Sequence, residues 1–203
     1  MPNQGVKPRW IMFCTGDYVI VAKLEEVISS SLRIYTYITT KNMKKESLNR
    51  VIKSPTPVNE KDGLTVFLAG PMKGAPKWQR TVPKLAEELG ISGVTFLNPY
   101  HCQRWVSWKA QVDWESAGLR LCDIALFWIP NQETEVEGRD YAQTTRMELL
   151  ENLALGKRVI LGIDTDIRAA DYMRYKASHY GVKHIHKTLE GCLKELKEEI
   201  SKA

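Results

Sequence analysis

The run of six apolar residues at 124–129, IALFWI, constrains the fold more than any other part of the chain. It contains no polar residue, and a polar loop at residues 130–143 follows it. A strand that is apolar at every position is buried on both faces, as happens in a parallel sheet covered by helices. We therefore expect residues 124–129 to form a central strand of such a sheet.

Around this run, short apolar strands alternate with amphipathic helices. The pattern predicts strands at residues 64–69, 94–97 and 158–162, and helices at residues 81–89, 108–121 and 188–202, with a further helix around Glu148. The last helix carries an apolar stripe at Leu189, Leu193, Leu196 and Ile200. Alternation at this spacing predicts an α/β fold, a doubly wound, flavodoxin- or Rossmann-like parallel sheet with helices on both faces.

The chain before residue 64 has a different character. Residues 54–63 hold Pro55, Pro57 and a terminal Gly63, and this composition predicts a linker. The linker would separate a small N-terminal extension, residues 1–53, from the α/β domain at residues 64–203. Residues 10–22 and 32–40 are rich in β-branched and aromatic residues, which favours strands, and residues 23–30 suit a short helix between them. The extension is thus predicted to be α+β or β-rich.

Composition narrows the class of protein. The sequence is 43% hydrophobic and 26% charged, as in ordinary soluble globular proteins. No apolar run has the length of a membrane span, and the polar start does not resemble a signal peptide. Four cysteines are scattered without a C-x-x-C pair, which favours free thiols in a reducing cytoplasm over disulfides or a metal site.

The formal net charge of +5 is concentrated at the N-terminal end. Residues 1–62 contain ten Lys or Arg and six Asp or Glu. A basic extension is compatible with contact to nucleic acid or to a protein partner. Because the charges are dispersed, a solvated surface is the favoured interpretation.

In an open parallel sheet, the loops after the strand carboxyl ends form the ligand crevice. Gly70 and Pro71 follow the first strand of the domain, Asn98 follows the second, and Trp128 lies near the end of the third. Trp128 is our choice of aromatic platform for a ligand ring, although most tryptophans pack in cores. Lys73, Lys77 and Arg80 follow the glycine turn and suit a phosphate, although a solvated basic loop fits them equally well.

Glu148 belongs to the same rim and has two interpretations. In Thr145-x-x-Glu148 the glutamate suits a capping box that closes a helix N-terminus. A carboxylate one turn inside a helix at the rim also suits a nucleophile. Asp113 and Glu115 lie in the preceding helix and would supply a second carboxylate, as glycosyl chemistry requires.

Four segments of the region from about residue 64 to residue 191 resemble the nucleoside 2-deoxyribosyltransferase superfamily. They are VFLAGP at 66–71, FLNP at 96–99, the helix from Asp113 that runs into CDIALFWIP at 122–130, and MEL at 147–149 with ALGK at 154–157. The order and spacing of these segments carry the resemblance. At MEL the family holds its nucleophilic glutamate.

The resemblance implies an activity and its residues. Glu148 would attack C1′ of a 2-deoxyribonucleoside, the base would leave, and a second base would take the sugar from a glutamyl ester. The related alternatives are hydrolysis of 2-deoxynucleoside 5′-monophosphates and a non-catalytic nucleotide-binding module. By its spacing from Asp123, Glu115 matches the family's acid that orients the nucleophile and the sugar, with Asp113 as the fallback. Asp140 is nearest to the base-recognising acid.

The implied reaction needs no cofactor and no metal, and the family is usually oligomeric, so a homo-oligomer is expected. The substrate would be a small nucleoside or nucleotide. The residues expected to contact it are Phe67, Gly70, Pro71, Asn98, Trp128, Asp140 and Thr145.

Overall fold

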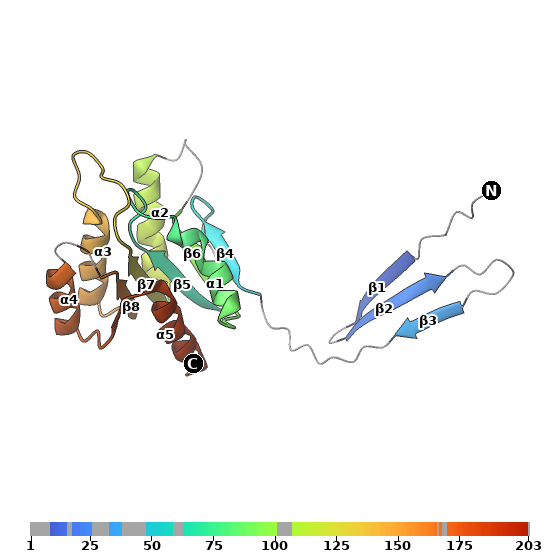
Figure 1. Cartoon of the computed structure of the whole chain (residues 1–203). Coiled ribbons are helices and arrows are strands. Elements are labelled where there is room, and N and C mark those ends of the chain that lie inside the picture. The colour runs from blue at the N-terminus through green and yellow to red at the C-terminus, as the bar shows by residue number, and fades with distance from the viewer. Residues whose placement is uncertain are drawn as a thin grey trace. The chain divides into compact units, whose positions relative to one another are not determined.

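The chain divides into two units, Met1–Glu46 and Ser47–Ala203. The computed structural model describes residues 9–15, 18–25, 33–37, 48–58, 63–100, 107–165, 167 and 170–202. In the first unit, β1 (Arg9–Thr15), β2 (Tyr18–Glu25) and β3 (Arg33–Tyr37) form an antiparallel sheet in the order β1-β2-β3 (Figure 1). The single strand predicted at residues 10–22 is therefore two strands. The helix predicted at residues 23–30 is wrong up to Glu25, where β2 ends, and its remainder lies outside the described residues.

The second unit contains a six-stranded sheet in which every pairing is parallel. Its strands are β4 (Arg50–Lys53), β5 (Leu64–Ala69), β6 (Val94–Asn98), β7 (Ile124–Ile129), β8 (Val159–Ile163) and β9 (Ile185–His186), in the order β4-β6-β5-β7-β8-β9. From β6 onward this is the flavodoxin-like order, in which the second strand precedes the first. The predicted doubly wound sheet is confirmed.

Helices cover both faces of this sheet (Figure 1). They are α1 (Val82–Glu88), α2 (Trp108–Leu121), α3 (Gln143–Ala154), α4 (Ala170–His179) and α5 (Leu189–Ser201), with a short 3₁₀ helix η1 (Trp78–Arg80) before α1. Among the described residues, none of these helices is both long and apolar enough to cross a membrane.

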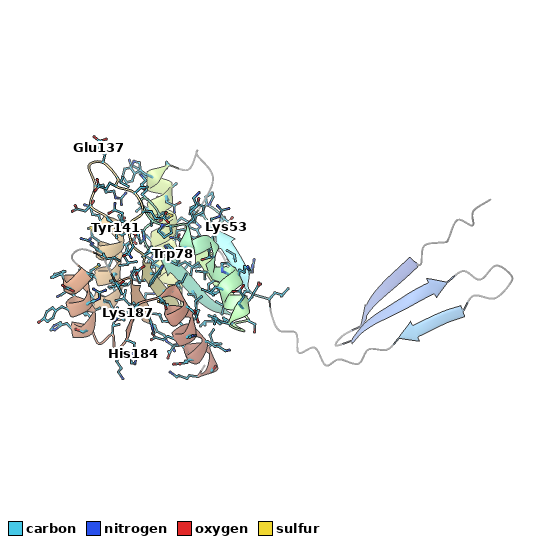
Figure 2. The ribbon with its side chains drawn as sticks, viewed as in Figure 1. Lys53, Trp78, Glu137, Tyr141, His184 and Lys187 are labelled. Atoms are coloured by element: carbon cyan, nitrogen blue, oxygen red, sulfur yellow. The ribbon has the colours of Figure 1, made fainter. Side chains whose placement is uncertain are left out.

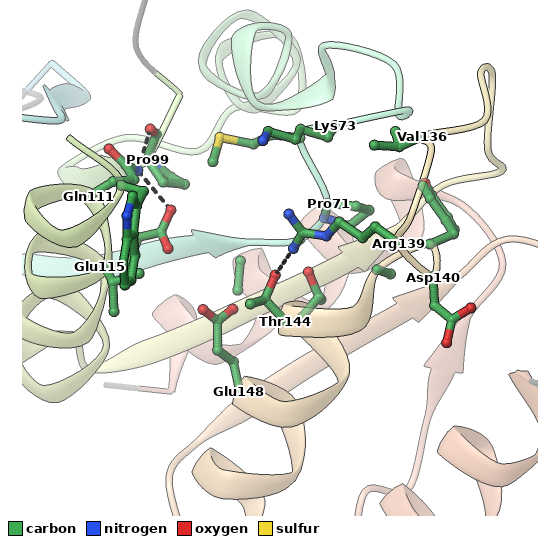
Figure 3. A pocket seen from close by; sticks show the side chains of 18 of the residues that line it. Pro71, Lys73, Pro99, Gln111, Glu115, Val136, Arg139, Asp140, Thr144 and Glu148 are labelled. Atoms are coloured by element: carbon green, nitrogen blue, oxygen red, sulfur yellow. Dashed lines mark hydrogen bonds between the residues drawn. The ribbon is translucent and has the colours of Figure 1, made fainter. Parts of the chain in front are cut away.

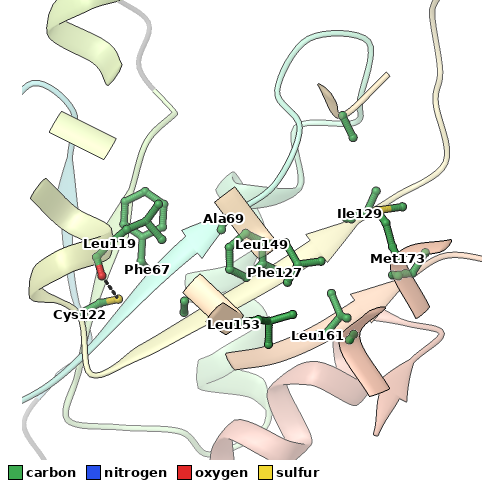
Figure 4. Close-up of a cluster of buried hydrophobic side chains, with 14 of the residues drawn as sticks. Phe67, Ala69, Leu119, Cys122, Phe127, Ile129, Leu149, Leu153, Leu161 and Met173 are labelled. Carbon is green, nitrogen blue, oxygen red and sulfur yellow. Dashed lines mark hydrogen bonds between the residues drawn. The ribbon is translucent and has the colours of Figure 1, made fainter. Parts of the chain in front are cut away.

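Side chains alternate across β7 because successive residues of a strand point to opposite faces. Phe127 belongs to the core that α2, α3 and α4 cover, together with Leu149 and Leu161 (Figure 4). Leu126 belongs to the core on the other face, under α1 and α5. All six residues of β7 are buried, as the sequence predicted.

The domain boundary lies earlier than the sequence indicated. Strand β4, placed by sequence in the N-terminal extension, pairs with β6 in the main sheet, where Ile52 lies opposite Leu97. Ser54, expected to begin a linker, is buried, and its amide donates to the carbonyl of Asn98 at 3.2 Å. The units divide at 46/47, so the boundary predicted at 53/54 is wrong, because an edge strand of four residues has no periodic signal of its own.

Candidate active site

A pocket of about 460 Å³ opens where β5 ends, between α2 and the loop that joins β7 to α3. The order of the strands reverses here. The chain runs from β5 to β6 on one side of β5 and then, through α2, crosses to β7 on the other side. Doubly wound sheets bind ligands at such a switch point. Nineteen residues line the pocket: Phe67, Ala69, Gly70, Pro71, Met72, Lys73, Pro99, Trp108, Gln111, Val112, Glu115, Val136, Arg139, Asp140, Tyr141, Ala142, Thr144, Thr145 and Glu148.

Glu148 reaches this pocket from the second turn of α3 (Figure 3). The helix begins after Ala142, whose φ of 55° is in the left-handed region, and no side chain caps its N-terminus. Thr145 is buried inside the first turn, so the capping-box interpretation of Thr145 and Glu148 is wrong. A left-handed alanine is strained, and such strain clusters at functional sites.

Glu115 enters the pocket from α2, and Figure 3 shows its carboxylate and that of Glu148 pointing into the same space. Ser107 caps α2 by accepting a hydrogen bond from the amide of Ala110 at 3.1 Å. The helix packs tightly on β5 at Gly118, where a Cβ atom would lie 2.6 Å from the Phe67 ring. This close approach brings α2, and Glu115 with it, to the carboxyl end of β5.

The pocket raises the pKa of Glu148 to about 8. Burial is the main cause because it penalises the charged form, and the negative charges of Glu115 and Glu151 add to it, while Arg139 lowers it. Arg139 also donates to the hydroxyl of Thr144 at 2.7 Å. A carboxyl group with so large a shift in a pocket is a candidate for chemistry.

Two basic side chains, Lys73 and Arg139, line the pocket. Lys73 lies in the turn after β5, and Arg139 lies in the loop before α3 (Figure 3). Of the three cations that the sequence offered for a phosphate, only Lys73 lines the pocket. Arg80 instead lies over the Tyr100 ring at 5.5 Å, and Lys77 is exposed outside the pocket.

The loop between β7 and α3 closes one side of the pocket. The Tyr141 hydroxyl donates to the carbonyl of Pro130 at 2.7 Å, and burial raises the pKa of this hydroxyl. Glu137 and Tyr141 lie at this end of the larger unit, whereas His184 and Lys187 lie toward the other end (Figure 2). Gly70 permits the turn after β5, because a Cβ atom there would overlap the Trp128 carbonyl oxygen.

Most of the predicted site residues come together in this pocket. Those that line it are Glu148, Glu115, Phe67, Gly70, Pro71, Asp140 and Thr145. Asp140 is exposed, and Figure 3 shows its carboxylate turned away from that of Glu148.

Three predicted residues lie elsewhere. Asp113 is exposed and does not line the pocket, so of the two candidate acids on α2 only Glu115 does. Trp128 packs on the opposite face of the sheet, against Gly162, because its position in β7 points it under α5. Asn98 is buried in a structural role: its amide donates to the Gln79 carbonyl at 2.9 Å, and its side-chain oxygen accepts from the Tyr100 amide.

Sequence reasoning missed several lining residues, among them Gln111, which makes three side-chain hydrogen bonds, and Arg139. Gln111 is four residues before Glu115, so a helix places both on one face, and this signal was available. Trp108, one turn before Val112, supplies the aromatic side chain that Trp128 does not.

Within the described residues, no group of three or more His, Cys, Asp or Glu side chains is arranged to hold a metal ion.

Comparison with known proteins gives one result. A search of curated proteins returned no match. Residues 63–167, just over half of the chain, match the sequence model of a family described as nucleoside 2-deoxyribosyltransferase like. The match spans β5 to the end of β8 and includes both Glu115 and Glu148. The chain belongs to the nucleoside 2-deoxyribosyltransferase like family.

Proposed function

We propose that this protein breaks the N-glycosidic bond of a 2-deoxyribonucleoside and transfers the sugar to a second base through an ester on Glu148. The observation that carries the proposal is the pair of carboxylates, Glu115 and Glu148, in one pocket at the switch point. A retaining glycosyl transfer needs a nucleophile and a negative environment for a cationic transition state. Membership of the family supports the same reaction class.

In the first step, a Glu148 oxygen forms a bond to C1′ while the bond from C1′ to the base nitrogen breaks. The base leaves with that electron pair and takes up a proton. In the second step, a nitrogen of the incoming base attacks C1′, loses its own proton, and releases the Glu148 carboxylate. Two inversions give net retention, and the protons balance over the cycle.

The two carboxylates explain how the pocket would favour the transition state. Without a ligand their charges oppose each other, which is one reason for the raised pKa of Glu148. A positive charge that develops at C1′ between them would be attracted to both. Glu148 must lose its proton before it attacks, so the reactive form of the free enzyme is the deprotonated one.

The test is product analysis with a deoxynucleoside, with and without a second base. The wild-type protein should yield free base and, with the second base present, a new deoxynucleoside. Glu148→Ala should release no base at an unchanged melting temperature, whereas Glu151→Gln, on the same helix but exposed, should remain active. An acid quench should leave a deoxyribosyl adduct on the peptide that contains Glu148. Intact ligand after long incubation with the wild-type protein would favour a binding module instead.

A second candidate is hydrolysis of a 2-deoxynucleoside 5′-monophosphate, in which water replaces the incoming base. Lys73 and Arg139 favour it, because both line the pocket and suit a phosphate group. Base release that needs the 5′-phosphate and yields 2-deoxyribose 5-phosphate, with no transfer product, would identify this reaction.

A further inference from the structure

We infer that Gln111 is a positioning residue that holds the Glu115 carboxylate in the pocket, and that the turn at Ser54 holds Gln111. The inference rests on the proposed function. It concerns a part of the chain that precedes the family match, since Ser54 lies before residue 63.

The contact between Gln111 and Glu115 is the first step. Nε2 of Gln111 donates to Oε1 of Glu115 at 2.7 Å, and the two residues lie four apart on one face of α2. A glutamate side chain has several rotamers, and a short hydrogen bond to its carboxylate selects among them. The same Nε2 also donates to the carbonyl of Pro99 at 3.0 Å, which ties α2 to the end of β6.

The Pro99 carbonyl and the Glu115 carboxylate only accept hydrogen bonds, so they decide which way the Gln111 amide points. The Ser54 hydroxyl donates to Oε1 of Gln111 at 2.7 Å. If the amide were reversed, its oxygen would meet the Pro99 carbonyl and the Glu115 carboxylate, and three acceptors would be crowded together. These two acceptors thus favour the orientation in which Gln111 donates to Glu115, and the Ser54 hydroxyl satisfies the amide oxygen and holds it in place. Ser54 is 4% exposed and Gln111 is 9% exposed, so water competes weakly for these bonds.

The turn that carries Ser54 is itself fixed. The Ser54 amide donates to the Asn98 carbonyl at 3.2 Å. Two residues further on, the Thr56 carbonyl accepts a hydrogen bond from the indole of Trp114 at 2.7 Å. Trp114 directly precedes Glu115 on α2, so the Ser54 turn contacts this helix at a second point. This second contact does not involve the Gln111 amide and supplies a matched control.

The experiment compares four variants of the full chain in the base-release assay. Gln111→Met keeps the side-chain length and removes the amide, and it should lower kcat about tenfold with KM changed by less than about threefold. Ser54→Ala should lower kcat in the same direction by a smaller factor, and Ser54→Thr, which keeps a hydroxyl, should restore it. Trp114→Phe loses the indole hydrogen bond and part of the buried ring but leaves the Gln111 amide in place, and it should lower the melting temperature while leaving kcat within about twofold.

A double-mutant cycle decides whether Gln111 acts through Glu115. If it does, Gln111→Met should have little further effect on kcat once Glu115→Gln is present. Independent, multiplicative losses would overturn the inference, and so would an unchanged kcat in Gln111→Met. If Gln111→Met fails to fold, Ser54→Ala with its Ser54→Thr rescue carries the same cycle. Absence of base release by the wild-type protein would instead count against the proposed function, so the two failures are distinguishable.

Discussion

Glu115 on α2 and Glu148 on α3 point their carboxylates into one pocket, and the charge of Glu115 helps to raise the pKa of Glu148 to about 8. The two residues lie on separate helices that pack on the same face of the sheet. The pKa of Glu148, the candidate nucleophile, therefore depends on Glu115, which can be substituted without changing Glu148.

The pH dependence of base release should reflect this coupling. The reactive form of Glu148 is the carboxylate, so kcat/KM of the wild-type protein should rise with pH and level off above about pH 8. Glu115→Gln removes a like charge and should move the midpoint to lower pH. Glu151→Gln should move the midpoint less, because the charge of Glu151 raises the pKa of Glu148 less than the charge of Glu115 does. Initial rates at low substrate concentration measure the profile, and equal midpoints for wild type and Glu115→Gln would contradict the prediction.

The same pKa shift predicts how stability changes with pH. Folding raises the pKa of Glu148 from its ordinary 4.5 to about 8, so between these values the folded state binds more protons than the unfolded state. This group's contribution to stability is therefore full below about pH 4.5 and is lost as pH rises through about 8. Glu148→Gln removes the penalty, so its advantage over wild type should grow by roughly 4 kcal/mol from pH 5 to pH 9. Urea unfolding at both pH values measures it, and a constant difference would count against the shift.

The two cations of the pocket should discriminate between substrates. Arg139→Gln and Lys73→Gln should each raise KM for a deoxynucleoside 5′-monophosphate about tenfold and leave KM for the free nucleoside nearly unchanged, since each removes a charged phosphate partner. Arg80→Gln is the matched control, because Arg80 is exposed outside the pocket. Equal effects on both substrates would show that these side chains do not bind a phosphate. Steady-state kinetics with the two substrates provide the measurement.

The close approach of α2 to β5 should be sensitive to a single methyl group. Gly118→Ala places a Cβ atom 2.6 Å from the Phe67 ring, so the helix must move. We expect a loss of about 1–3 kcal/mol in the free energy of unfolding, together with lower activity because Glu115 moves with α2. Phe67→Leu in the same protein makes room and should recover part of the stability, as denaturant unfolding would measure. An additive loss in the double variant would contradict this account.

The fold was largely predictable because its signals are local. The apolar run at β7 and the strand–helix alternation are properties of short segments, and the predicted ends of α2, β5 and β7 agree with the structure. The position of Glu148 on the rim followed from the same alternation. Strand β4 was not predictable in this way, because its place in the sheet depends on pairing with β6, more than forty residues away.

Within the site, local sequence patterns did not predict the direction in which each side chain points. Asp113 and Glu115 are both acids on α2, but positions two residues apart are separated by about 200° around the helix axis. Only one of the two side chains can therefore enter the pocket. Trp128 is the last residue but one of β7, and the alternation of side chains along the strand places it on the other face of the sheet. Thr145 and Glu148 have the residue types and spacing of a capping box. However, α3 begins at Gln143, after the left-handed Ala142, so Thr145 lies inside the helix and does not cap it.

By itself, the sequence determined the parallel sheet, the order of its main strands and helices, the family, and the rim on which Glu148 lies. Only the tertiary structure showed that Glu115 enters the pocket while Asp113 does not, that Gln111 contacts Glu115 and Ser54 contacts Gln111, and that β4 belongs to the sheet. The physical reason is range. Burial periodicity acts within a few residues, whereas a pocket is made by side chains from distant segments whose directions are set only when the helices pack on the sheet.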